Sequence, residues 1–410
     1  MNSFSALDAQ HFKRGQQSTG HAISAWLVVH ARGSTALTAG ARPVLNRGDP
    51  EAPADLRDRR FVDRGEQFLH ASRKSPTDRT DGLPHAQPMA TARSLIVQPG
   101  QLGHFHVVVR CVQQLFLCGR CRVSGRNYDH RRGWIETRIL ELGELFAVSV
   151  HSYAVMSNHL HLVITVDPEA VAEWSDWEVV QRGALLQRRA GETEEQRLAR
   201  ALVWRDQPER IEKLRAKLGS LSEYMKALNE FIAKKANRES GRKGNFWDDR
   251  FKCQRLEDEG ALLSAMVYVD LNPIRAKLAE DLPGSDHTSA QRRLRQMQSD
   301  RRQLGAPMVA VAGPAKRRLL DLTQAAYLEL VDQTGRQLHP GKRGRISVAT
   351  PPVLRTLGLN HRQWLTQVKG IESRYWRAVG SVDSLLRLAE RLGQRWVRGL
   401  VGAKALQRMR

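Results

Sequence analysis

Two histidines separated by a single residue stand inside an otherwise apolar run, MSNHLHLVIT, from Met156 to Thr165. In a β-strand, residues i and i+2 project from the same face, so His159 and His161 share one face while the leucines beside them take the other. Two neutral imidazoles, roughly 6 to 7 Å apart at their Cα atoms by strand rise, can converge on one cation if another element adds a third ligand. The pair therefore predicts a metal site, although two histidines on a solvated sheet face would give the same pattern.

A tyrosine and an asparagine stand further along the chain in AMVYVDLNPIRA, from Ala265 to Ala276. Helical spacing places Tyr268 and Asn272 four residues apart on one face, beside small alanines. The opposite, leucine-rich side would pack on the core, so the alanines would leave room for a bulky substrate next to the phenol. A core tyrosine followed by a helix-terminal asparagine before Pro273 is the alternative interpretation.

Basic and aromatic side chains lie around these two motifs, most of them in GNFWDDRFK. Cations can hold phosphates, and exposed aromatic rings can stack on unpaired bases. For the aromatic pair, filling of the core is an equally good explanation. The candidate nucleic-acid contacts are Arg250, Lys252, Arg275, Phe246 and Trp247.

In chain order, the motifs HLH (His159 to His161), GNFWDDRFK (Gly244 to Lys252) and YVDLNPIRA (Tyr268 to Ala276) resemble the HUH single-tyrosine transposase superfamily, in which U is a bulky hydrophobe. The resemblance is closer to its REP-associated tyrosine transposase branch. The resemblance covers about residues 95–290 and includes YAVMSN before the histidine pair. It implies that His159, His161 and Asn272 bind a divalent cation and that Tyr268 attacks a phosphate of DNA. It also implies single-stranded, hairpin-forming DNA such as REP-like palindromes as the partner, and a monomer or a homodimer as the active form.

The chemistry explains why each residue type is needed. A cation on a nonbridging phosphate oxygen draws off negative charge and orients the group for in-line attack. Nitrogen and oxygen ligands without thiolate favour Mg²⁺ or Mn²⁺, although imidazole also accepts Zn²⁺. Attack by the Tyr268 phenolate would form a 5′-phosphotyrosine and release a 3′-hydroxyl, which conserves the bond energy for rejoining. The predicted activity is transposase-like strand cutting and joining; the alternative is a non-catalytic regulator that binds folded DNA or RNA.

The elements that would position these residues follow from the hydrophobic pattern. Alternation predicts strands over HFHVVVR, VSVHSYAVM, HLHLVITV and FKCQRL, with a turn at Ser157 and Asn158. Helical spacing predicts helices over residues 129–146, about 220–238 and about 258–271. The order strand, helix, strand, strand is half of a ferredoxin-like plan, so the expected fold class is α+β, an antiparallel sheet with packed helices.

The chain divides into three predicted regions. Residues 1–88 lack a sustained period, which predicts a disordered segment or, because Met89 opens patterned sequence, one outside the natural protein. Residues 89–290 would form the catalytic domain, with a charged helical insertion at about 170–220. Residues 291–410 are expected to form a basic helical appendage that binds flanking DNA or mediates dimers.

Charge and cysteine usage set the wider context. The 410 residues include 65 Lys and Arg against 43 Asp and Glu, a net charge of +22 that makes nucleic acid the default partner. The four cysteines are too few for a disulfide framework and indicate a reducing cytoplasm, where the protein would associate with the nucleoid. Cys118 and Cys121 form a CxxC without a second pair, so small buried hydrophobes are preferred over a zinc site. The apolar runs are too short to span a bilayer, so neither membrane insertion nor secretion is predicted.

Overall fold

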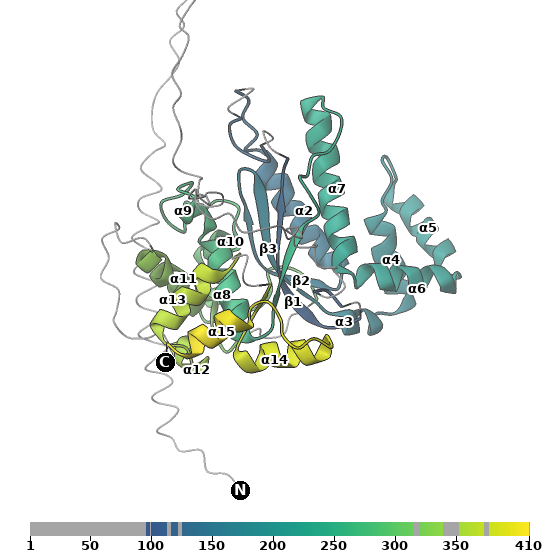
Figure 1. Ribbon diagram of the computed structural model, residues 1–410. Helices are drawn as coiled ribbons and strands as arrows, with labels where there is room; N and C mark the ends of the chain where they lie inside the picture. Colours follow the sequence, from purple (N-terminus) through teal and green to yellow (C-terminus); the bar gives the residue numbers. More distant parts are fainter. Residues whose placement is uncertain are drawn as a thin grey trace, which may run out of the picture. The chain divides into compact units, whose positions relative to one another are not determined.

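The computed structural model, drawn in Figure 1, describes residues 96–98, 100–112, 116–121, 125–314, 320–338, 352–372 and 377–409. The predicted disordered or spurious segment 1–88 lies outside the described residues.

A five-stranded sheet forms the centre of the fold, in the order β2-β3-β1-β4-β5. Its strands are β1 (Gly103–Arg110), β2 (Val148–Val155), β3 (His159–Val166), β4 (Lys252–Leu256) and β5 (Ala378–Val379). The first four pair antiparallel, whereas β5 runs parallel to β4. The α+β prediction is confirmed, with one correction: the sheet is mixed, because a two-residue strand from the C-terminal region extends it. A strand this short has no alternation that a sequence pattern could reveal.

Helices cover both faces of the sheet. The chain order β1, α2 (Arg131–Leu145), β2, β3, α7 (Leu221–Ser240), β4 is ferredoxin-like. On one face, β1, β2 and β3 share a hydrophobic core with α2 and α7. On the other face, α8 (Glu259–Asp270) packs over β2 and β3 within a second core. The Asp258 carboxylate accepts a hydrogen bond from the Ala261 N–H at 2.8 Å, which fixes the start of α8.

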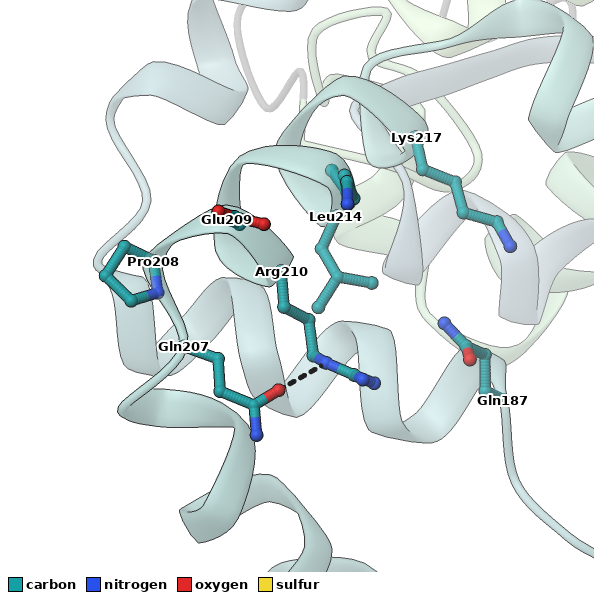
Figure 2. A pocket seen from close by; sticks show the side chains of 8 residues that line it. Gln187, Gln207, Pro208, Glu209, Arg210, Leu214 and Lys217 are labelled. Atoms are coloured by element: carbon teal, nitrogen blue, oxygen red, sulfur yellow. Dashed lines mark hydrogen bonds between the residues drawn. The ribbon is translucent and has the colours of Figure 1, made fainter.

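Four helices lie between β3 and α7, in the region predicted as a charged helical insertion. They are α3 (Pro168–Ala172), α4 (Asp176–Leu186), α5 (Glu194–Arg205) and α6 (Pro208–Leu218). Gly183 of α4 lies against Leu214 of α6, where an added Cβ would come within 2.7 Å of the leucine. A cavity of about 560 Å³ opens at α6. Arg210, one of its lining residues, donates a hydrogen bond to Gln207 at 2.7 Å. Figure 2 shows these lining side chains. The cavity shares no residue with the histidine motif.

The C-terminal region is helical, as predicted. After α9 (Asn272–Arg275) follow α10 (Ser289–Ser299), η2 (Arg301–Leu304), α11 (Gln324–Leu338), α12 (Pro352–Thr356), α13 (His361–Gly370), α14 (Val382–Arg391) and α15 (Leu400–Gln407). Helices α11 and α13 contribute to the same core as α8, so this region supports the helix that carries Tyr268. Within the described part of the chain, every helix is too short or too polar to cross a bilayer.

Candidate metal and tyrosine site

The sheet face beneath α8 carries three histidines in contact. His106 of β1 lies on the same face as His159 and His161 of β3. Val108, which is two residues after His106 and so shares its face, is the register partner of His161. His106 and His161 are thus diagonal neighbours, and their rings stack with centroids 5.3 Å apart and planes 3° apart. The His106 Nε2 and His161 Nδ1 atoms are 3.1 Å apart, so one nitrogen donates to the other.

The end of α8 brings the predicted tyrosine and asparagine onto these histidines. Asn272 begins the short helix α9 directly after α8, and Pro273 stands in its first turn. The Asn272 Nδ2 atom lies 3.0 Å from His161 Nε2. The Tyr268 ring meets the His161 ring edge to face at 6.0 Å, and the His159 ring meets His161 at 4.7 Å. All four residues predicted as ligands or nucleophile therefore lie together in space.

A glutamate from the C-terminal region completes the cluster. Glu372 follows α13, with a φ of 67° that non-glycine residues rarely adopt. Its carboxylate accepts a hydrogen bond from the Tyr268 hydroxyl, and its Oε1 atom lies 3.7 Å from His161 Nδ1. The donor atoms of His106, His161 and Glu372 all lie within 4.8 Å of one another, a spacing that allows one metal ion to contact all three. This donor set differs from the predicted one, which used His159 and Asn272.

His161 belongs to both donor sets through different ring nitrogens. Its Nε2 faces Asn272, whereas its Nδ1 faces His106 and Glu372. A neutral imidazole carries a proton on one nitrogen and a lone pair on the other, so His161 coordinates a metal through one set at a time. If Nε2 binds the metal, Nδ1–H donates to His106, the usual arrangement for a metal-bound histidine.

The electrostatics keep these imidazoles in the neutral form that binds metals. Burial lowers the pKa of His106, with the Glu372 charge opposing it. Burial, followed by the neighbouring histidine, lowers the pKa of both His159 and His161 well below the usual value. The Nδ1 atom of His159 lies 2.5 Å from the Asn158 side-chain oxygen, to which it donates, so its Nε2 keeps a lone pair.

Two of the three predicted ligands, His161 and Asn272, lie close enough to contact one cation. Neighbouring ligands of an octahedral Mg²⁺ ion, each about 2.1 Å from the metal, are roughly 3 Å apart. The Asn272 amide and the His161 Nε2 atom have this separation, 3.0 Å. A half-turn of the amide presents its oxygen, the ligand atom that such cations prefer, at the same place.

The Tyr268 side chain belongs to the buried cluster around α8 and is also contacted by two charged side chains, Glu372 and Arg275. Only 4% of Tyr268 is exposed, yet the exposed residue Arg275 holds its guanidinium carbon 4.3 Å above the ring. Burial and the Glu372 charge raise the pKa of Tyr268, while the Arg275 charge opposes them. The phenol is therefore neutral in this arrangement, and Arg275 is the nearby cation that favours the phenolate.

The predicted nucleic-acid contacts fall in different places. Lys252 is exposed and pairs with Val108, which pairs with His161, so its side chain leaves the sheet on the histidine face. Arg250 is exposed just before β4. Phe246 is 5% exposed within the core, and the half-buried Trp247 donates its indole N–H to the Asn229 carbonyl at 3.0 Å. The burial of Phe246 favours the alternative role, filling of the core, over base stacking.

Sequence reasoning missed three residues of this site. His106 follows His104 in HFH, the same alternation that drew attention to His159 and His161, so its position could have been predicted. Arg110 ends β1 opposite His159 and is exposed. Glu372 has no local signal, because only the packing of α13 against α8 brings it to the tyrosine.

Comparisons with known proteins add one distant similarity. No family model matches the sequence, and no curated protein matches it. A solved structure described as "Structure of the REP associates tyrosine transposase bound to a REP hairpin" is similar over 47% of this chain and 80% of its own chain, with 10% sequence identity and a TM-score of 0.29. A similarity this low does not establish family membership.

Proposed function

We propose that this chain is a metal-dependent enzyme that cuts and rejoins single-stranded, hairpin-forming DNA through a 5′-phosphotyrosine intermediate. One observation carries the proposal: a β-strand imidazole pair meets the phenol and amide of one helix end. The amide of Asn272 lies 3.0 Å from His161, whose ring is 6.0 Å from the Tyr268 ring. These are the residue types and positions that the motif resemblance assigns to metal ligands and nucleophile.

The side chains divide the chemical work between them. His159, His161 and Asn272 would hold Mg²⁺ or Mn²⁺, which supplies charge neutralisation at a phosphate oxygen. His106 would accept the His161 Nδ1–H and so fix that ring with its Nε2 lone pair directed at Asn272. The Tyr268 oxygen forms the new bond to phosphorus while the bond to the 3′-oxygen breaks. Its hydroxyl already donates to Glu372, the nearest group able to take the proton.

Cations around the centre would hold the DNA backbone. Arg110 lies opposite His159 on the neighbouring strand, and Lys252 lies in line with His161 two strands away, roughly 10 Å by strand spacing. Arg275 covers the tyrosine ring itself. Each can contact a phosphate on one side of the scissile group.

The test is a covalent adduct. A labelled single-stranded hairpin is incubated with the full chain and Mn²⁺, and a protein–DNA adduct that survives denaturation is expected from wild type but not from Tyr268→Phe. Tyr128→Phe is the matched control, because Tyr128 lies under Arg131 and outside the site. An adduct from Tyr268→Phe would identify another nucleophile. No adduct with several hairpins and metals would leave the alternative, a non-catalytic binder of folded DNA or RNA.

A further inference from the structure

The loop between α14 and α15 displays an aromatic side chain among cations. It reads GQRWVRG, from Gly393 to Gly399. Trp396 is 58% exposed, whereas Val397 is 6% exposed and belongs to the small core formed with α14, α15 and β5. Arg395, Trp396 and Arg398 are exposed around the buried Val397, so these three side chains face solvent rather than that core.

The exposure of Trp396 is unusual for this protein. The other tryptophans that the structure describes are buried or half-buried: Trp134, Trp174, Trp177, Trp204, Trp247 and Trp364. The exposed part of a large aromatic side chain gains nothing from the folding of its own chain. The exposed part of Trp396 is therefore open to contact with a ligand.

The loop is held rigidly against the sheet. The Arg398 carbonyl accepts hydrogen bonds from the backbone N–H groups of Arg377 and Ala378, both at 3.0 Å. Gly399 has a φ of 134°, and a Cβ there would lie 2.0 Å from the Ala378 carbonyl oxygen, so only glycine permits this contact. A loop fixed in this way loses little conformational entropy when it binds a ligand.

The charges around Trp396 favour an anionic ligand. Arg395 and Arg398 are exposed, and Arg377 is half-buried beside them. Burial and the Arg398 charge lower the pKa of Arg377, which reflects the closeness of two guanidinium groups. Within the described part of the chain, no ion pair involves these three arginines, although nearby Arg391 pairs with Glu257.

The loop from Gly393 to Gly399 adjoins the sheet that carries the histidine site. Ala378 of β5 pairs with Arg255 of β4, which in turn pairs with Phe105 of β1, the neighbour of His106. Strand spacing places β5 roughly 10 Å from β1. The loop is therefore joined through β5 and β4 to the strand that carries His106.

We propose that Trp396, Arg395 and Arg398 form a platform on which an unpaired base of single-stranded DNA stacks while the arginines hold the adjacent phosphates. Arginine and aromatic side chains are the combination that single-strand binding surfaces use without reading sequence. The choice of DNA rests on the proposed function, but stacking requires neither the metal nor the tyrosine. Duplex DNA, whose bases are already stacked, does not fit this surface.

Equilibrium binding tests the platform. Fluorescence anisotropy of a labelled, unstructured oligothymidine is measured with the full chain in the absence of divalent metal. Trp396→Ala is expected to raise Kd by on the order of 5- to 100-fold, and Trp396→Phe to keep most of the affinity. Leu386→Ala, at an exposed apolar position on α14, is the matched control and should leave Kd unchanged. Equal Kd values for wild type and Trp396→Ala would overturn the proposal.

Photocrosslinking of the wild-type chain gives an answer that does not depend on how the variants fold. An oligonucleotide that carries 5-iodouracil should crosslink to Trp396, in the Glu-C peptide that begins at Arg391. Binding without a crosslink in that peptide would exclude the platform. An adduct at Tyr268 without this crosslink leaves the proposed enzyme intact and removes only the platform. A crosslink without any adduct at Tyr268 would support the platform but show a protein that binds DNA without cutting it.

Discussion

His161 occupies a position where the protonation of one ring decides which residues can act as ligands. Its Nε2 atom faces Asn272 at 3.0 Å, and its Nδ1 atom faces His106 at 3.1 Å. Because the pKa of His161 is held well below its usual value by burial and by His106, the ring has one lone pair at neutral pH. When the Nδ1–H group donates to His106, the lone pair on Nε2 is the one that can bind the metal.

Metal binding by single-residue variants separates the two donor sets. Asn272→Ala is expected to weaken Mn²⁺ binding by on the order of 10- to 100-fold or more, whereas Glu372→Gln should change it only slightly. The reason is that Glu372 is not a ligand in the set of His159, His161 and Asn272, and its carboxylate accepts the Tyr268 hydroxyl instead. The readout is the electron paramagnetic resonance signal of free Mn²⁺ during titration, with Asn245→Ala as an exposed control. The opposite ranking would assign the ion to His106, His161 and Glu372.

A buried histidine outside the site makes the free energy of unfolding depend on pH. His151 of β2 is 1% exposed, with its Nε2 atom 2.6 Å from the Thr165 hydroxyl. Burial, aided by the charges of His104 and Arg293, lowers the pKa of His151 to about 3. Below the unfolded-state pKa, roughly 6.5, the unfolded chain binds a proton that the folded chain does not. Folding therefore loses stability as pH falls from that value towards the folded-state pKa.

The expected slope is about 1.4 kcal/mol of unfolding free energy per pH unit from this one residue. In His151→Gln the amide can still contact Thr165, but the slope that His151 contributes should disappear. Urea unfolding of both proteins at about pH 7 and about pH 5 measures the difference. Parallel pH dependences would show that the buried imidazole does not titrate in this way.

At the scale of elements, local patterns predicted what lies within one strand or helix. The alternation in HLHLVITV placed both histidines on one face of β3, and helical spacing set Tyr268 and Asn272 together. The same reasoning, applied to HFHVVVR, would have added His106. Glu372 and β5 could not be predicted, because their positions depend on how α13 packs on α8 and how a distant two-residue strand joins β4.

Helix α8 depends on a buried polar network for its position. The Asp270 carboxylate is fully buried and accepts hydrogen bonds from the Ser289 hydroxyl at 2.5 Å, the Ala290 N–H at 3.0 Å and the Tyr327 hydroxyl at 2.5 Å. These donors belong to α10 and α11, so the network joins the end of α8 to the C-terminal helices. Tyr268 stands two residues before Asp270, on the same helix.

Loss of one donor should therefore weaken both the fold and the site. Tyr327→Phe keeps the ring in the core but leaves Asp270 with one hydrogen bond fewer, which is expected to cost about 1 to 3 kcal/mol of unfolding free energy. Chemical denaturation measures this cost, and the adduct assay measures the effect on Tyr268. Tyr224→Phe is the control, because its hydroxyl donates to the Ile139 carbonyl on the opposite face of the sheet at 3.1 Å. Equal losses of adduct formation in both variants would argue against a specific role for the network.

At the scale of the whole molecule, the two faces of the sheet have different roles. One face packs against α2 and α7 in a hydrophobic core, while the other holds the histidines under α8. Three exposed cations, Arg110, Lys252 and Arg275, lie at the second face. Residues 1–88 contribute little to the net charge, because they carry 12 Lys and Arg against 9 Asp and Glu, whereas the chain as a whole has a net charge of +22. The predicted DNA-binding surface therefore belongs to the remainder of the chain.

This arrangement predicts how strongly salt opposes DNA binding. Each phosphate neutralised on a single strand contributes about −0.7 to the slope of log K against log salt, so five cations give about −3.5. A fourfold rise in salt should then weaken binding roughly 100-fold. The five proposed contacts are Arg110, Lys252, Arg275, Arg395 and Arg398.

Single variants test whether the charge acts locally or through the overall field. Lys252→Gln should make the slope shallower by about 0.7, because one counterion fewer is released. Arg205→Gln removes the same charge from the insertion, where Arg205 pairs with Asp206 at 3.4 Å, and should leave the slope unchanged. Anisotropy titrations of a single-stranded oligonucleotide at several salt concentrations give both slopes. If the two variants shift the slope equally, the net charge of the molecule attracts DNA without a defined path, and the local contacts assigned around the tyrosine and Trp396 lose their basis.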